Sequence, residues 1–82
     1  MLKYNRGDYM TIPERIKALR EERTNYNQTE FGKLLNMSQL QVSRIETGRA
    51  HLKDEDIILY CNFFNVSADY ILGLPELPYP KR

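Results

Sequence analysis

The stretch QTEFGKLLNMSQLQVSRIET, residues 28–47, carries the pattern that decides the fold. Its regularly spaced apolar residues are Phe31, Leu35, Met37, Val42 and Ile45. A helix brings residues three or four positions apart onto one face. Phe31 and Leu35 therefore share a face of one helix, Val42 and Ile45 share a face of the next, and Met37 falls at the corner between them. The spacing predicts two short helices joined by a tight turn.

Two short helices joined in this way form a helix-turn-helix, a common device for placing a helix in the major groove of DNA. Three pairs of residues have the spacing of a capping box, in which side chains and backbone N–H groups at a helix start satisfy each other: Thr11 with Glu14, Asn27 with Glu30, and Ser38 with Gln41. Asn36 and Gly48 tolerate the left-handed conformation that ends many helices. The sequence predicts five helices and no strand, at about residues 12–23, 28–35, 39–47, 54–64 and 68–72.

The chain is predicted to form one all-α domain. Its 82 residues suffice for a single small core and leave no room for a separate sensor domain. The core face of the first helix is expected to carry Ile12, Ile16, Leu19 and the stem of Arg23, and that of the fourth helix Ile57, Tyr60, Cys61 and Phe64. We expect a flexible N-terminal arm over residues 1–10, a compact bundle of four or five helices over 11–74, and a Pro-rich tail over 75–82.

The net charge of +1 hides an uneven distribution. Residues 1–53 contain ten Lys and Arg against six Asp and Glu, whereas residues 54–82 contain two against five. The helix-turn-helix half is therefore basic, as a nucleic-acid contact requires, and the other half should face away from DNA. No apolar run approaches the ~20 residues that cross a membrane, so we expect a soluble, intracellular protein.

The segment LREERTNYNQTEFGKLLNMSQLQVSRIETGR, residues 19–49, followed by FFNVSADYILGL, residues 63–74, resembles the Xre-type, phage-repressor-like helix-turn-helix family of bacteria and their phages. The chain departs from the usual pattern at Gly32, where Ala is common, at Asn36, where Gly is common, and in a turn over 24–27 that is one residue longer. The resemblance implies a lambda-repressor-like DNA-binding fold, a cytoplasmic homodimer on an inverted-repeat operator, and a transcriptional regulator, in many members a repressor. It also implies that Glu46 pairs with Arg20.

The outward positions of the second motif helix are the candidate base contacts: Gln39, Leu40, Ser43 and Arg44. Gln39 suits a bidentate pair with adenine, Arg44 the same with guanine, and Leu40 a thymine methyl group. Gln41 is assigned to capping and left out. Candidate contacts to the DNA backbone are Asn27, Gln28, Thr29, Ser38, Thr47, Arg49 and Lys53. Among these, Gln28 opens a helix whose free N–H groups can hold a phosphate, and the family uses this position in that way.

The C-terminal part has more apolar side chains than so short a segment buries by itself. We assign the surplus to a dimer interface: Ile58, Leu59, Phe63, Tyr70, Ile71, Leu74, Leu77 and Tyr79. In a competing interpretation, the Pro-rich tail folds back over these residues.

Other classes of function find less support. His51 is the only histidine, and no phosphate-binding loop or metal-spaced Cys/His set occurs, so we expect no enzyme, no cofactor and no metal. The single cysteine, Cys61, is predicted to be a small buried hydrophobic residue. The serious alternative is a protein-interaction module, such as an antitoxin that binds a partner protein through its C-terminal half.

Overall fold

The computed structural model describes residues 10–73, which form five helices and no strand in that range: α1 (Ile12–Arg23), α2 (Gln28–Leu35), α3 (Gln39–Glu46), α4 (Asp54–Phe64) and α5 (Ala68–Leu72). The prediction of an all-α bundle is confirmed. Most of the N-terminal arm and all of the tail lie outside the described residues, so the proposed domain boundaries stay predictions.

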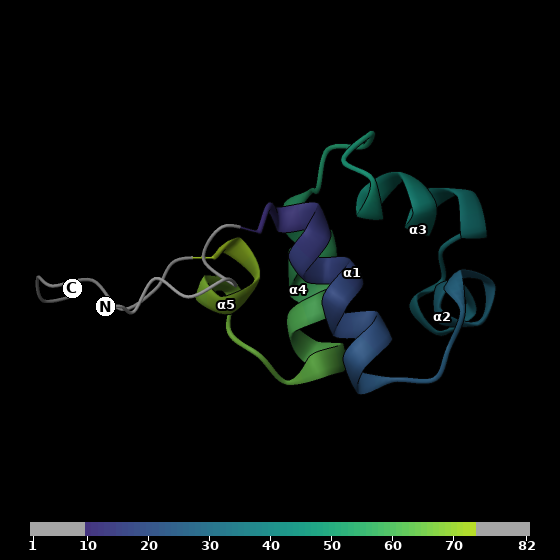
Figure 1. The fold of residues 1–82 in the computed structure, drawn as a ribbon, viewed down its shortest axis with the longest axis horizontal. Helices are drawn as coiled ribbons and strands as arrows, with labels where there is room; N and C mark the ends of the chain where they lie inside the picture. The colour runs from purple at the N-terminus through teal and green to yellow at the C-terminus, as the bar shows by residue number, and fades with distance from the viewer. Residues whose placement is uncertain (1–9, 74–82) are drawn as a thin grey trace, which may run out of the picture.

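The helices divide into two groups along the longest axis of the molecule (Figure 1). At one end α3 packs on α2 and also on α1, and at the other end α5 packs on both α1 and α4. The ring of Phe31 on α2 joins the two groups, because it contacts the rings of Tyr60, Phe63 and Phe64 on α4 at centroid distances of 5.8, 5.2 and 5.7 Å. The helix-turn-helix is therefore held against the rest of the domain by an aromatic cluster.

The helix starts follow the capping prediction with one correction. The pairs Thr11 with Glu14 and Asn27 with Glu30 form complete boxes, with N···O distances of 2.8 to 3.2 Å. At α3 the box is only half formed: Ser38 Oγ accepts from the backbone of Gln41, but the Gln41 side chain does not return to Ser38. The prediction that Gln41 is committed to capping is therefore wrong, and its side chain is exposed on α3.

The turn between α2 and α3 is unusually close to α2. Asn36 adopts the left-handed conformation with φ of 60°, and Met37 N donates to Gly32 O over 2.7 Å. A Cβ atom on Gly32 would collide with the carbonyl oxygen of Met37. Gly32 therefore permits an approach of two backbones that an alanine would force apart.

The buried core matches most of the expected positions. It consists of Ile16, Leu19, Phe31, Leu35, Met37, Val42, Ile45, Tyr60, Phe64 and Ile71. Ile12, Ile57 and Cys61 are only half-buried, so Cys61 is not the buried hydrophobe that was predicted. Arg23 is exposed, and Arg20 takes the inward place on α1. The helical spacing of α1 allows either Arg20 or Arg23 to face the core, and the ion pair with Glu46 on α3 selects Arg20.

Tyr60 is fully buried, and its hydroxyl has no hydrogen-bond partner among the described residues. Burial is the main cause that raises the pKa of Tyr60 above its usual value. We expect Tyr60→Phe to keep or increase the free energy of unfolding at neutral pH, because it removes a buried polar group that has no partner. Urea denaturation measures this effect, and a loss of more than ~1 kcal/mol would contradict the expectation.

Tyr60 also determines how the free energy of unfolding changes at high pH. The folded state keeps the phenol protonated where the unfolded chain releases its proton, so this titration leaves the free energy of unfolding unchanged below pH ~10 and lowers it as the pH rises above that value. The wild-type protein should therefore lose stability above pH ~10 more steeply than Tyr60→Phe does.

Candidate nucleic-acid interface

The outer face of α3 carries the four predicted base contacts. Gln39, Leu40 and Arg44 are exposed and Ser43 is half-buried, while Val42, Ile45 and Glu46 on the same helix are buried. Positions 40, 43, 44 and 47 follow one another at helical spacing, so they form one continuous surface. Leu40 is 53% exposed, which is a large apolar exposure in the middle of a polar face.

A chain of hydrogen bonds runs from this face into the core. Gln39 Nε2 donates to Gln28 Oε1 over 2.7 Å, and Gln28 Nε2 donates to Glu46 Oε1 over 3.0 Å. Arg20 closes the chain with two bonds to the Glu46 carboxylate, of 2.7 Å from Nε and 3.0 Å from Nη2. Three helices, α1, α2 and α3, thus contribute side chains to one network.

The network fixes which way each amide points. A carboxylate only accepts hydrogen bonds, so the NH₂ group of Gln28 faces Glu46 and its oxygen faces Gln39. Gln39 therefore donates one of its two side-chain N–H groups to Gln28, and its other N–H and its oxygen stay available for a partner. One donor beside one acceptor is the set that matches N7 and the N6 amino group of adenine.

The ion pair of Arg20 and Glu46 is the buried end of the network. Their side chains are 9% and 0% exposed. Arg20 also donates from Nη1 to the carbonyl oxygen of Tyr26 over 2.9 Å, so it ties the α1–α2 turn to α3. The hydrogen bond with Glu46 raises the pKa of Arg20 against the opposing effect of burial, so the guanidinium stays charged. The pairing that the family resemblance implied is confirmed.

The predicted backbone contacts, called the rim residues below, stand at or next to helix ends. They occupy the start of α2 (Asn27, Gln28, Thr29), the start of α3 (Ser38), its end (Thr47, Arg49) and the residue before α4 (Lys53). All are exposed except Gln28, which is half-buried. The Asn27 and Ser38 side chains already cap their own helices, and Thr47 Oγ1 donates to Ser43 O, so these three have less freedom to reach a phosphate. Arg49 and Lys53 offer the long cationic side chains.

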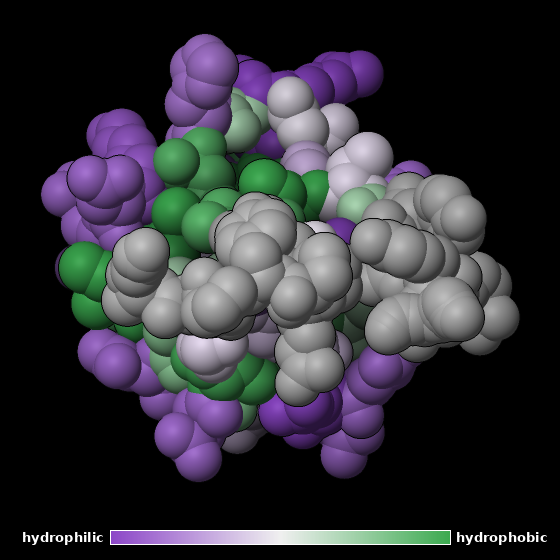
Figure 2. Space-filling view, turned by 90° about the vertical axis from the view of Figure 1, so that its left-hand side faces the viewer, coloured by the Kyte–Doolittle hydropathy of each residue, from purple (hydrophilic) through white to green (hydrophobic). Residues whose placement is uncertain are grey.

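The predicted dimer surface is only partly present. Ile58, Leu59 and Tyr70 are 59%, 38% and 46% exposed, and Phe63 is half-buried. Ile71 was predicted to join them and does not: it is completely buried in the core, because it turns inward where α5 packs on α1 and α4. Leu74, Leu77 and Tyr79 lie outside the described residues. Figure 2 looks onto the α5 side and shows hydrophobic residues gathered on that face.

The described residues offer no other obvious chemistry. No group of three or more His, Cys, Asp and Glu in that part of the chain is placed to hold a metal ion. No helix among residues 10–73 is long and apolar enough to span a membrane. His51 is exposed in the loop between α3 and α4.

Two short helices joined by a tight turn, with one face of the second helix exposed, define a protein of the helix-turn-helix class. A family model described as helix-turn-helix matches residues 16–71. The chain belongs to that family, the Cro/C1-type, Xre-like regulators, whose domains bind double-stranded DNA. Searches of curated proteins and of solved structures returned no significant match.

Sequence reasoning alone did not find the bond between Gln28 and Gln39. The two residues are eleven positions apart, and only the geometry of the turn brings their side chains together. A pair of amide residues at the starts of the two motif helices is the signal that could have indicated it.

The buried ion pair gives a stability prediction. Arg20→Ala should lower the free energy of unfolding by ~3–5 kcal/mol, because it leaves the Glu46 carboxylate buried without its cation. The double variant Arg20→Met with Glu46→Leu should recover most of that loss, since no buried charge remains. Urea denaturation of the three proteins checks both statements. A double variant as unstable as Arg20→Ala would show that the loss comes from packing instead.

Proposed function

We propose that this protein is a sequence-specific transcriptional regulator, acting as a repressor, that binds an inverted-repeat operator as a homodimer with α3 in the major groove. The observation that carries the proposal is the fixed amide of Gln39 on the exposed face of α3. A glutamine in contact with solvent alone is free to rotate, whereas Gln39 is held by a hydrogen-bond chain that reaches the buried ion pair. This orientation suits a residue that presents one donor and one acceptor to a base edge.

Affinity and specificity have different sources in this proposal. Gln39, Leu40, Ser43 and Arg44 read base edges, whereas the rim residues, foremost Gln28, Arg49 and Lys53, contact phosphates and set the position of α3. Gln28 keeps one side-chain N–H and the free N–H groups at the start of α2 for a phosphate. The excess of positive charge in residues 1–53 supports this orientation.

A single domain of this size reads only a few base pairs, so specificity requires two copies. Two-fold symmetric binders place their reading helices one turn of DNA apart, ~34 Å. Ile58, Leu59 and Tyr70 supply the exposed apolar surface that we assign to the contact between copies.

The decisive experiment is selection of bound DNA from a random duplex pool at two salt concentrations. The proposal requires an inverted repeat with a steep salt dependence, since cationic side chains release counterions from the phosphates. Weak binding without sequence preference would overturn it and favour the protein-interaction alternative, in which a partner protein occupies the C-terminal half.

Two substitutions on α3 test the assignment of the readers. Gln39→Ala and Arg44→Ala should each lower affinity for the selected operator by ~5- to 150-fold, the equivalent of ~1–3 kcal/mol, with the loss confined to one base step. Asn62→Ala on α4 and Lys17→Ala on α1 are the controls, because they remove an exposed amide and an exposed cation at positions away from α3. Unchanged operator preference in Gln39→Ala or Arg44→Ala would refute the corresponding contact.

The dimer assignment has its own test. Ile58→Lys should shift the protein toward monomer in analytical ultracentrifugation and weaken binding to the full operator, while the preferred half-site sequence stays the same. Leu34→Lys is the control, because Leu34 is 55% exposed on α2 and lies outside the assigned interface. Equal behaviour of the two variants would remove Ile58 from the interface.

A further inference from the structure

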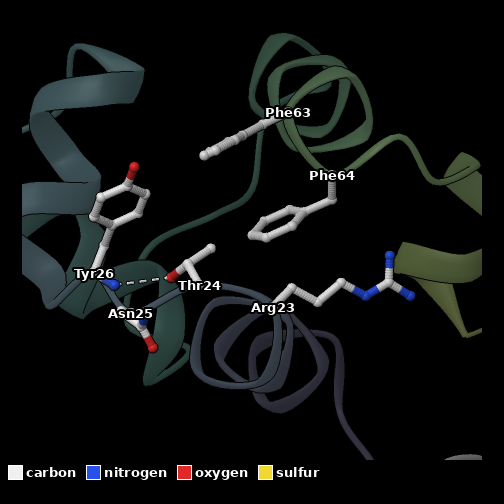
Figure 3. A pocket seen from close by; sticks show the side chains of 6 residues that line it. All are labelled: Arg23, Thr24, Asn25, Tyr26, Phe63 and Phe64. Carbon is white, nitrogen blue, oxygen red and sulfur yellow. Dashed lines mark hydrogen bonds between the residues drawn. The ribbon is translucent and has the colours of Figure 1, made fainter.

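An aromatic groove lies on the domain away from the face of α3. It forms where the turn between α1 and α2 meets the end of α4, and its volume is about 450 Å³. Its lining is drawn in Figure 3 and consists of Arg23, Thr24, Asn25, Tyr26, Phe63 and Phe64. Nothing in the proposed DNA contact uses this groove.

The walls of the groove are already fixed. Figure 3 shows the Tyr26 ring on one side and the rings of Phe63 and Phe64 reaching toward it from α4. Phe63 is stacked between Phe64, at a centroid distance of 5.0 Å, and Phe31, at 5.2 Å, so it has little freedom to move. On the opposite wall Thr24 Oγ1 accepts from Tyr26 N over 3.1 Å and donates to Arg20 O over 2.7 Å.

Tyr26 is nevertheless 42% exposed. A preformed pocket with an exposed ring at its edge has the character of a binding site. Its occupant should be apolar and low in conformational entropy.

We infer that the groove binds the segment LPELPYP, residues 74–80, of the same chain. This segment begins directly after the last described residue, Gly73, and it has prolines at 75, 78 and 80. Grooves lined by aromatic side chains bind proline-rich segments in the polyproline II conformation, in which little entropy is lost on binding. Leu77 and Tyr79 provide the apolar side chains that fill such a groove.

The segment starts close enough to reach the groove. Gly73 lies against the guanidinium group of Arg15 on α1. From Arg15 to Arg23, at the groove, the helix rises only ~12 Å, at ~1.5 Å per residue. Seven residues in a polyproline II conformation span ~22 Å.

The charge at the edge of the groove also suits this occupant. Arg23 extends toward α5, where its guanidinium carbon lies 5.9 Å from the centre of the Tyr70 ring. The segment would pass this cation on its way to the groove, and Glu76 is its only charged residue. An ion pair between Glu76 and Arg23 therefore fixes the direction in which the segment enters.

Because the segment is covalently attached to the domain, only a weak affinity for the groove is needed to keep it bound. A short flexible connection gives an effective concentration on the order of millimolar, so even a weak intrinsic affinity keeps the groove occupied. A second copy would have to bind at the far lower concentration of the protein in solution. The same-chain occupant is for this reason the one that the geometry favours.

The test is nuclear Overhauser spectroscopy on the full chain, with a sample that mixes isotope-labelled and unlabelled protein. We expect contacts within one molecule between protons of Leu77 or Tyr79 and the rings of Tyr26, Phe63 or Phe64. Absence of such contacts would overturn the inference. Contacts found only between labelled and unlabelled molecules would overturn it too, since they would make a second copy the occupant.

Charge exchange provides a second readout that leaves the core untouched. Arg23→Glu alone and Glu76→Arg alone should each weaken these contacts, and the double variant should restore them. Lys81→Glu, directly after the segment, is the control and should leave these contacts unchanged. Equal contacts in all four variants would exclude the ion pair, and with it the direction of entry that we infer. The outcome is independent of DNA binding, so failure of either proposal leaves the other standing.

Discussion

The buried ion pair between Arg20 and Glu46 is the constraint on which the rest of the structure depends. It joins α1 to α3, holds the turn before α2 through the carbonyl of Tyr26, and supplies the acceptor that orients Gln28. Buried ion pairs contribute little net stability when compared with apolar residues of similar size. The contribution of this pair is mainly geometric, because two parallel hydrogen bonds from Nε and Nη2 restrict how the guanidinium and the carboxylate can be oriented.

The aromatic cluster and the polar network have different roles in this domain. The aromatic cluster around Phe31 is apolar and sets how strongly the helix-turn-helix is attached to α4, whereas the polar network sets how α3 is turned and which atoms it presents. Apolar packing tolerates small displacements, but hydrogen bonds of 2.7 to 3.0 Å do not. The surface that we propose to read base edges thus depends on the less tolerant of the two.

The sequence predicted the helices well because their signals are local. Capping residues and helical spacing act over three or four positions, and α1, α2 and α3 begin directly after the predicted caps Thr11, Asn27 and Ser38. What sequence reasoning missed depends on contacts between distant segments. Ile71 was assigned to an exposed surface because its burial requires α1 and α4 to meet over α5, and Arg23 was assigned to the core because α1 alone offers no reason to prefer Arg20. The groove between Tyr26 and Phe63 has no pattern along the chain at all, since its two walls are joined only by the fold.

The two ends of the described domain are neighbours. The guanidinium of Arg15 donates to the carbonyl oxygen of Met10 over 2.8 Å and also lies against Gly73, so the chain enters and leaves the bundle at one place. In Figure 1 this place is at the opposite end of the long axis from α2 and α3. A fluorescent protein, an affinity tag or a ligand-responsive domain joined directly to Met10 or to Gly73 would therefore extend from the side remote from α3. The exposed face of α3 is, in this respect, separated from whatever is joined to the domain at that place.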